Sequence, residues 1–251
     1  MYREKQEKLW NTDAALRYDT PGEGAFAPGV LVPTVERLAA LAGDGAALEF
    51  AVGTGRVAVP LAERGVPVTG IELSRPMVDR LRAKADAAAL PVVIGDMATT
   101  RAPGSYRLVY LVYNTISNLQ TQDEQVECFR NAARHLEPGG RFVIELWVPE
   151  LRRLPPGREA TVGLCEPGYI LLDTYDVLHQ RAVSYHFRYD DETGAARLDR
   201  SPHRYIWPAE LDLMARLAGF ELESRHADWS GGEFTADSPS HVSVYRLPDG
   251  S

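Results

Sequence analysis

Two glycines and a carboxylate lie at a spacing that suits the binding of a nucleotide-like ligand. The apolar run from Ala47 to Val52 leads directly into Gly53-Thr54-Gly55, and the segment 56–64 that follows has a helical pattern. Glycine lacks the Cβ atom that would keep a ligand away from the backbone at such a turn. We therefore expect the turn to admit a ligand, and a side chain introduced at Gly55 to meet that ligand's tail.

Two acidic residues follow at the ends of the next apolar runs. Glu72 lies 19 residues after Gly53, where a carboxylate accepts both hydroxyls of a ribose, in a dinucleotide or in any other adenosine. Asp96 ends the run 92–96, where an acid can accept the exocyclic amine of adenine while Met97 packs on the ring. A solitary Asp at such a position is also a common turn former. The three features together predict an adenosine site along one edge of a sheet.

The elements that must position these residues alternate between strand and helix. Apolar runs predict five strands at residues 47–52, 67–71, 92–96, 106–113 and 142–147. Helical patterns between them begin after caps at Ser74 and Thr121, and Pro138-Gly139-Gly140 is expected to end the helix that Thr121 begins. Successive βα units predict an α/β fold, a doubly wound, mostly parallel sheet of Rossmann-like type with helices on both faces.

The pattern changes after Pro149. Residues 183–189 alternate between aromatic and polar side chains, and with 169–177 and 197–207 they predict a three-stranded antiparallel meander. A helix over 208–218 and two strands at 220–229 and 242–247 complete the chain, the last two pairing antiparallel. We therefore divide the sequence into an N-terminal helical lid (1–30), a cofactor-binding core (31–150), an inserted meander (165–207) that roofs the substrate or contacts a second subunit, and a closing helix and hairpin (208–251).

At this point the sequence resembles the class I S-adenosylmethionine-dependent methyltransferases. Five stretches carry the resemblance in order: Glu49-Phe50-Ala51-Val52-Gly53-Thr54-Gly55-Arg56, Gly70-Ile71-Glu72-Leu73-Ser74, Gly95-Asp96-Met97, Tyr113-Asn114-Thr115 and Leu136-Glu137-Pro138-Gly139-Gly140. The departure is Ala51, where many members carry glycine. The resemblance covers roughly residues 30–147 and implies S-adenosyl-L-methionine as cofactor and S-adenosyl-L-homocysteine as product.

The resemblance also implies a role for each strand end. Glu49, Ala51, Gly53 and Gly55 would surround the methionine part of the cofactor. Glu72 would bind the ribose, Asp96 and Met97 the adenine, and Tyr113 and Asn114 would lie near the sulfonium. Three further residues complete the predicted cofactor site: Arg56 and Leu73 from these stretches, and Met77 on the helix that follows Ser74.

The lid and the segment after the fourth strand provide the predicted catalytic residues. Tyr18, before a Pro/Gly loop, resembles a lid tyrosine that often touches the cofactor in small-molecule members; a packed aromatic that anchors the first helix is the alternative. Asn118 stands near the point where some amino-sugar N-methyltransferases place a histidine. The predicted substrate pocket contains side chains from this segment and the meander: Asn118, Trp147, Tyr175, His186 and Tyr205. His186 and His203 are base candidates by location alone.

Composition limits the partners of such an enzyme. A formal net charge of −8 over 251 residues disfavours nucleic acid and anionic lipid. No histidine or cysteine pair has metal-ligand spacing, so we expect no metal. The charged N-terminus does not resemble a signal peptide, and no apolar run approaches the roughly 20 residues of a membrane span. We expect a cytoplasmic monomer or homodimer without a membrane partner.

The sequence thus predicts methyl transfer to a small molecule, with an amine of a secondary metabolite as the acceptor. Methyl transfer from a sulfonium is an in-line displacement that positioning alone can accelerate strongly. A small-molecule O-methyltransferase is the nearest alternative. Gly53, Gly55 and Ala58 also satisfy a dinucleotide fingerprint, so a nicotinamide-dependent oxidoreductase is a second. A non-catalytic adenosyl-binding protein is the third.

Overall fold

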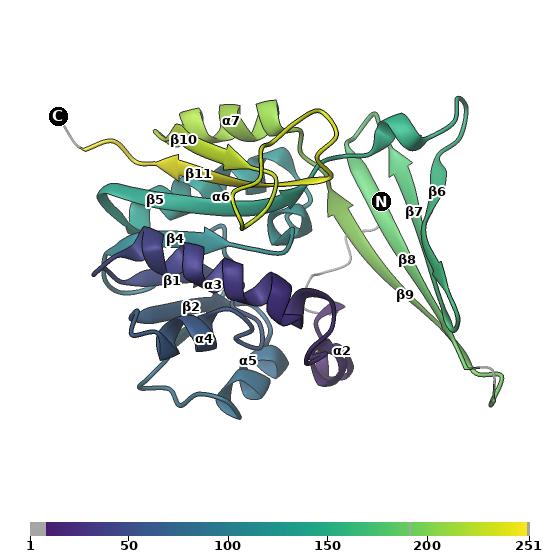
Figure 1. Ribbon diagram of the computed structural model, residues 1–251, viewed down its shortest axis with the longest axis horizontal. Helices are drawn as coiled ribbons and strands as arrows, with labels where there is room; N and C mark the ends of the chain where they lie inside the picture. The colour runs from purple at the N-terminus through teal and green to yellow at the C-terminus, as the bar shows by residue number, and fades with distance from the viewer. Residues whose placement is uncertain (1–8, 191, 250–251) are drawn as a thin grey trace.

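The computed structural model describes residues 9–190 and 192–249 and places them in two sheets (Figure 1). The larger sheet has the strand order β10-β11-β5-β4-β1-β2-β3, and the smaller one the order β6-β7-β8-β9. The bounds of the larger sheet's strands are β1 Ala47–Phe50, β2 Val68–Glu72, β3 Val92–Ile94, β4 Tyr106–Leu111, β5 Leu136–Trp147, β10 Glu221–His226 and β11 Ser240–Arg246.

The five predicted parallel strands are all present. β1 pairs in parallel with both β2 and β4, β3 lies beyond β2, and β5 lies beyond β4. The chain therefore reverses its direction of winding between β1 and β4. Open α/β sheets bind ligands outside the carboxyl ends of the strands at such a point. The topology brings the ends of β1, β2, β3 and β4 to one edge, as the sequence predicts.

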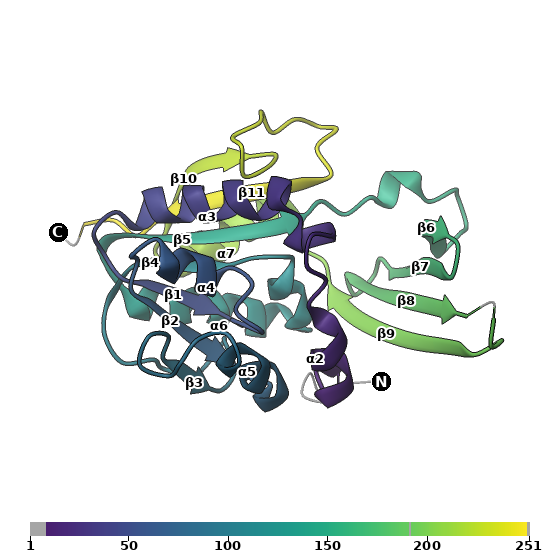
Figure 2. The same ribbon diagram turned by 60° about the horizontal axis from the view of Figure 1, so that its bottom comes forward.

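Helices cover both faces of this sheet (Figure 2). On one face lie α3 Pro28–Ala42, α4 Ala58–Glu63 and α5 Arg75–Arg82; on the other lie α6 Gln122–His135 and α7 Pro208–Leu217. The predicted caps are confirmed, since the Ser74 hydroxyl accepts from the Met77 amide and Thr121 forms a capping box with Glu124. The helix that begins after Thr121 ends at His135, three residues before Pro138, because the chain enters β5 at Leu136.

The smaller sheet corrects one prediction. Its strands are β6 Ala160–Glu166, β7 Tyr169–Asp176, β8 Arg181–Tyr189 and β9 Ala196–Arg204, each antiparallel to the next. The prediction of a three-stranded meander was wrong, because the insert has four strands and begins at Ala160 rather than at residue 165. β6 lies at the edge and pairs with β7 across a bulge between Val162 and Leu164. Most of its residues are exposed, so the period-two alternation of a half-buried strand is missing.

Four short elements and a hairpin complete the described chain. The lid contains α2 Thr12–Tyr18 and the 3₁₀ turn η1 Gly24–Phe26; η2 Thr115–Asn118 follows β4, and η3 Leu151–Arg153 precedes the smaller sheet. β10 and β11 pair antiparallel, and β11 pairs antiparallel with β5, which confirms the predicted closing hairpin. No helix within residues 9–190 and 192–249 has both the length and the apolarity needed to cross a bilayer.

Candidate cofactor and acceptor site

Glu72 and the glycine turn lie in direct contact. One carboxylate oxygen, Oε2, accepts from the Gly53 amide at 2.8 Å, and Oε1 accepts from the Ser74 amide at 2.7 Å. The side chain is buried, and burial raises its pKa, while the hydrogen bonds from Ser74 and Gly53 oppose that shift. Each carboxylate oxygen has a second lone pair. The residue predicted to bind a ribose therefore also fixes the turn beside it.

The two glycines of the turn serve different purposes. Gly53 has φ +57°, and a Cβ atom there would have only the Ala51 carbonyl oxygen nearby, at 3.9 Å. Gly55 has φ +80°, and its Cβ would lie 2.9 Å from a Val59 methyl group and 3.1 Å from Leu81 Cγ. A side chain at Gly55 would thus enter the packing between α4 and α5. The expectation that it would meet a ligand's tail was wrong; Gly53 faces open space.

This difference predicts two opposite phenotypes. We expect Gly55→Val to lower the free energy of unfolding by about 2–4 kcal/mol, because it adds a clash to left-handed strain. Gly53→Ala should cost only about 1–2 kcal/mol of backbone strain, and it places a methyl group in the open space. Thermal unfolding and calorimetric titration with S-adenosylhomocysteine would separate stability from affinity. A stable Gly55→Val protein that binds weakly would contradict this assignment.

Glu49 forms a buried polar cluster at the end of β1. The carboxylate is 3 % exposed and accepts from the Tyr110 hydroxyl at 2.9 Å. Burial raises its pKa to about 8, against the opposing effects of the Tyr110 hydrogen bond and the Arg56 charge. The Arg56 guanidinium also donates to the Ala25 carbonyl and lies over the rings of Phe26 and Tyr113, at 5.8 and 5.2 Å. A buried acid of this kind suits a cationic ligand group.

The end of β3 lies next to Glu72. The Gly95 amide donates to the Glu72 carbonyl at 2.9 Å, so Asp96 follows directly at the same edge. Asp96 Oδ1 accepts from the Ala98 amide at 2.7 Å, which is the turn-forming contact that the sequence allowed. Met97 and Met77 are buried, and Leu73 is partly buried. The structure thus brings the predicted adenine residues to one edge, and their contacts with an adenine remain a prediction.

The lid is attached to the glycine turn through Asp19, the residue that follows the predicted lid tyrosine. Asp19 accepts from the Thr54 hydroxyl at 2.6 Å and pairs with Lys84 at 2.7 Å, while Lys84 also donates to the Thr54 carbonyl. Tyr18 precedes it, and its ring forms edge contacts with Trp10 and Phe26 at 5.8 and 6.0 Å. The adjacent Pro/Gly loop was the only local signal that this part of the chain folds back.

If the lid retains the ligand, Asp19→Asn should release it faster. The substitution keeps one acceptor oxygen and removes the partly buried ion pair with Lys84. We expect the dissociation rate constant of S-adenosylhomocysteine to rise by about tenfold, which corresponds to a barrier lower by roughly 1.4 kcal/mol. Stopped-flow displacement would measure this rate. Glu23→Gln is the matched control, since Glu23 is an acid of the same lid and is exposed. Equal rates in both variants would exclude a restraining role for Asp19.

The backbone at the end of β4 is held in an unusual conformation. Tyr113 and Asn114 both have positive φ, at 55° and 62°. Side chains and backbone of β5 hold them, since Glu145 accepts from the Tyr113 amide at 2.7 Å and the Asn114 side-chain oxygen accepts from the Trp147 amide at 2.7 Å. Strain of this kind in non-glycine residues collects at functional sites. Glu145 was missed because its partner lies 32 residues away.

Comparison with known proteins distinguishes S-adenosylmethionine from a nicotinamide dinucleotide as the cofactor. A family model described as a methyltransferase domain matches residues 47–140. The cypemycin N-terminal methyltransferase of a Streptomyces species is 30 % identical over 203 residues, which are 76 % of this chain and 78 % of that protein. The chain belongs to the class I S-adenosylmethionine-dependent methyltransferases. S-adenosylmethionine is its cofactor, and the nicotinamide oxidoreductase alternative was wrong.

Two further proteins are similar to this methyltransferase. The solved structure of the CcbJ methyltransferase from Streptomyces caelestis is 39 % identical, with a TM-score of 0.82, and the match covers 94 % of this chain and 96 % of that one. The dTDP-3-amino-3,4,6-trideoxy-α-D-glucopyranose N,N-dimethyltransferase of Streptomyces venezuelae is 31 % identical over 100 residues, 40 % of this chain and 41 % of that protein. The structural match thus includes the lid and the smaller sheet as well as the core.

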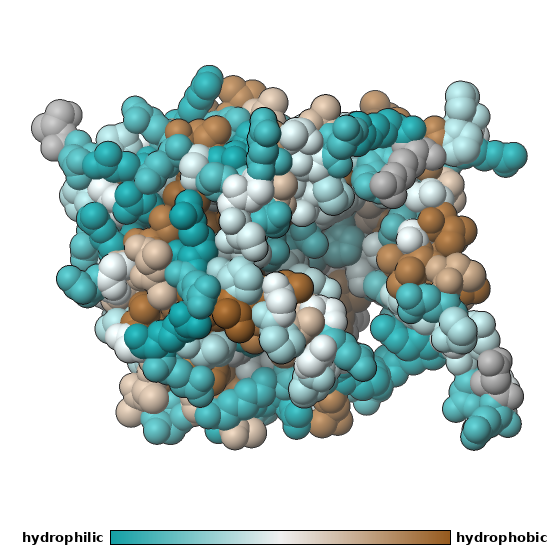
Figure 3. All heavy atoms as spheres, in the orientation of Figure 1, coloured by the Kyte–Doolittle hydropathy of each residue, from teal (hydrophilic) through white to brown (hydrophobic). Residues whose placement is uncertain are grey.

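The methyltransferase has a hollow between its core and the smaller sheet (Figure 3). The end of β4 lies on one side of it, and β7 to β9 lie on the other. Burial raises the pKa of Tyr18 to about 12, and Arg56, Tyr113, Glu49 and Glu72 act on its phenol electrostatically. Burial also raises the pKa of Tyr169 on β7, and Tyr113 contributes to that shift. The phenols of Tyr18 and Tyr169 therefore both lie within electrostatic range of Tyr113.

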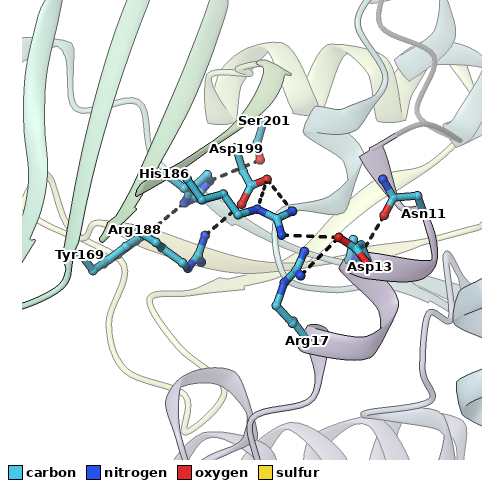
Figure 4. A network of polar contacts seen from close by, with 10 residues as sticks. Asn11, Asp13, Arg17, Tyr169, His186, Arg188, Asp199 and Ser201 are labelled. Carbon is cyan, nitrogen blue, oxygen red and sulfur yellow. Dashed lines mark hydrogen bonds and ion pairs between the residues drawn. The ribbon is translucent and has the colours of Figure 1, made fainter. Parts of the chain in front are cut away.

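His186 lies on the face of the smaller sheet that meets the lid (Figure 4). Its ring nitrogens contact two hydroxyls, Nδ1 that of Tyr169 at 2.7 Å and Nε2 that of Ser201 at 3.3 Å. Burial and the Arg188 charge lower its pKa, which keeps the imidazole neutral. Beside it, Arg197 on β9 pairs with Asp13 of α2 at 3.6 Å. The lid thus contacts both the cofactor edge and the smaller sheet.

The other predicted pocket residues lie where the smaller sheet joins the core. Tyr175 and Tyr205 are buried against each other, with ring centroids 6.3 Å apart, and Trp147 packs on Tyr205 at 6.4 Å. Tyr205 is 1 % exposed, so it supports the joint from within. Asn118 is partly buried at the end of η2. The structure groups these residues around the joint, and their contact with a substrate remains a prediction.

Proposed function

We propose that the enzyme transfers a methyl group to the amine nitrogen of a small secondary metabolite. Two relatives support this choice of atom, because one is named an N-terminal methyltransferase and the other an N,N-dimethyltransferase of an amino sugar. We propose that the hollow between the core and the smaller sheet receives the acceptor.

The cofactor would be held by the strand-end residues. The open space at Gly53 and the buried carboxylates of Glu72 and Glu49 fit a ligand with ribose hydroxyls and an ammonium group. We assign Glu72 to the ribose, Glu49 to the ammonium, and Asp96 with Met97 to the adenine. When bound, S-adenosylmethionine supplies an electrophilic methyl carbon. The chain's own part is then to orient the acceptor, exclude water and accommodate positive charge.

The state of the titratable groups facing the hollow favours an amine over a hydroxyl. The raised pKa values of Tyr18 and Tyr169 keep both phenols protonated at neutral pH. Both ring nitrogens of His186 are committed to hydroxyl contacts. A hydroxyl acceptor usually needs a general base, whereas a neutral amine presents its own lone pair. Tyr18 and Asn118 are the proposed catalytic residues, through orientation of the acceptor nitrogen; aromatic faces such as that of Tyr18 also stabilise cations.

A paired panel of acceptors tests this proposal. Purified enzyme and S-adenosylmethionine are incubated with small amines and with alcohols of the same carbon skeleton, and products are identified by mass spectrometry. We expect methylated amines and no methylated alcohols. Methylation of the alcohols would instead support the O-methyltransferase alternative. Binding of S-adenosylhomocysteine without turnover of any acceptor would support a non-catalytic adenosyl-binding protein.

The remaining predictions concern the enzyme's surroundings. We propose a cytoplasmic monomer or homodimer that acts without a metal, nucleic acid or membrane partner. The net charge of −8 supports the exclusion of nucleic acid and anionic lipid. Size-exclusion chromatography with light scattering would measure the oligomeric state. Activity retained after exhaustive treatment with a chelator would support metal-independent transfer.

A further inference from the structure

The joint between the smaller sheet and the core contains a buried arginine. Arg204 ends β9, and its side chain is 7 % exposed. Its Nη2 donates to Glu210 on α7 at 2.7 Å and to Gln180 at 3.1 Å, and its Nη1 donates to Gln125 on α6 at 2.6 Å. The planar guanidinium fork therefore joins the smaller sheet to two helices of the core at once.

Gln125 extends this contact to η2, the segment that follows the strained end of β4. Its side chain is fully buried, and its Nε2 lies within hydrogen-bonding distance of the carbonyls of Leu119, Ile116 and Arg204, at 3.0, 3.4 and 3.1 Å. A second link runs in parallel, since Gln120 Nε2 donates to the Pro202 carbonyl at 3.3 Å. β9 is thus connected at both Pro202 and Arg204 to η2 and the residues that follow it.

The partners of Arg204 are themselves held in place. Glu210 Oε2 accepts from Gln180 Nε2, and Glu210 Oε1 accepts from Gln122 as well as from Arg204. Burial alone would raise the pKa of Glu210, but the hydrogen bonds from Arg204 and Gln180 outweigh it and leave the pKa lowered. The pair is therefore ionised at neutral pH. A buried ion pair adds little net stability over apolar packing, but its directional hydrogen bonds can specify one geometry.

We propose that Arg204 is a positioning residue for the acceptor: it fixes the smaller sheet against η2 and so sets the width of the acceptor site, without contributing to cofactor binding. The proposal rests on the proposed function only in placing the acceptor between these two elements. Arg204 acts through Gln125 and η2, since its own side chain is enclosed at the joint. The side-chain partners of Arg204 are Gln125, Gln180 and Glu210, and none of them is among the residues assigned to the cofactor.

Three variants test the proposal. Arg204→Met removes the fork and leaves Glu210 unpaired; the double variant Arg204→Met, Glu210→Gln removes both charges, so that the fold is not lost to an unpaired buried carboxylate. Arg200→Met is the matched control, because Arg200 lies on the same strand, is exposed, and stacks on Tyr185 instead. Each protein is titrated with S-adenosylhomocysteine and followed by hydrogen exchange with mass spectrometry.

We expect amide exchange in residues 115–120 and 196–204 of both Arg204 variants to accelerate by about tenfold or more, with β1 and β2 unchanged. Affinity for S-adenosylhomocysteine should remain within about twofold of the parent. With an amine that the parent methylates, KM should rise and kcat fall, and neither should change in Arg200→Met.

Unchanged exchange in those segments would overturn the proposal. So would faster exchange throughout the chain together with weaker S-adenosylhomocysteine binding, because that result indicates a general structural role. The exchange and binding measurements need no acceptor. If no amine on the panel is methylated, the proposed function fails while these two measurements still decide the role of Arg204.

Discussion

Glu72→Ala should reduce binding of S-adenosylhomocysteine to near or below the limit of detection. The variant loses the carboxylate that we assign to the ribose hydroxyls and also the acceptor of the Gly53 and Ser74 amides. Hydrogen bonds to charged groups are worth about 1.5–3 kcal/mol each, so loss of two of them weakens affinity by roughly 10² to 10⁴-fold. Isothermal calorimetry at millimolar ligand would still detect binding if the loss is at the small end of this range, and would detect none if it is at the large end. The effect should exceed that of any other strand-end substitution.

Two further proteins separate ligand contact from damage to the turn. Asp79→Ala removes an exposed acid on α5 and should bind normally. Glu72→Gln keeps one oxygen for the Gly53 or Ser74 amide, so its turn is less disturbed, yet it cannot accept two ribose hydroxyls as a carboxylate does. We expect it to fold like the parent by circular dichroism and to bind at least about tenfold more weakly. Parental affinity in Glu72→Gln would contradict the ribose assignment.

The parallel sheet could be predicted because local signals agree with the global arrangement. The apolar runs at β1, β2, β4 and β5 are covered on both faces, and such strands have nearly continuous apolar sequence. The caps at Ser74 and Thr121 mark the helix starts. Parallel strands then bring their carboxyl ends to one edge without further information. The prediction that Gly53 and Glu72 lie close together followed from this property of parallel strands alone.

The residues that attach one part of the molecule to another could not be found in the same way. Asp19 accepts a hydrogen bond from Thr54, which is 35 residues away in the sequence, and Arg204 donates one to Gln125, which is 79 residues away. The sequence around these residues has no pattern that reveals either contact, because a single polar contact between distant segments produces no periodicity. The same limit explains Gly55, whose glycine requirement comes from Leu81 on another helix. Ala51 departs in the opposite direction: its φ is 52°, a conformation that favours glycine, yet the residue is alanine.

Binding of S-adenosylhomocysteine should strengthen with pH and release a proton. Glu49 has a pKa of about 8 in the ligand-free protein, so below that pH it is mostly protonated. Only its ionised form attracts the ligand's ammonium group, and binding must therefore remove the proton. We expect affinity to rise by up to about tenfold per pH unit between about pH 6 and 8, and then to level off. Titrations in buffers of different ionisation enthalpy would count the proton directly.

The stability of the ligand-free protein should change in the opposite direction. Because the pKa of Glu49 is raised from 4.5 to about 8 on folding, its protonated form favours the folded state. That contribution is complete below pH 4.5 and is lost as pH rises from 4.5 through 8, by an amount on the order of 5 kcal/mol. Glu49→Gln should therefore become more stable than the parent as the pH rises, and its affinity for S-adenosylhomocysteine should be low and nearly independent of pH.

Tyr110→Phe distinguishes this linkage from a general effect of pH on the fold. The Tyr110 hydroxyl donates to Glu49 and lowers its pKa, so its removal should move the rise in affinity to higher pH and leave the shape of the curve unchanged. Tyr106→Phe is the control, because the Tyr106 hydroxyl donates to the Pro103 carbonyl and does not touch Glu49. A curve that is identical in Tyr110→Phe and the parent would mean that another group takes up the proton, and that Glu49 does not meet the ammonium.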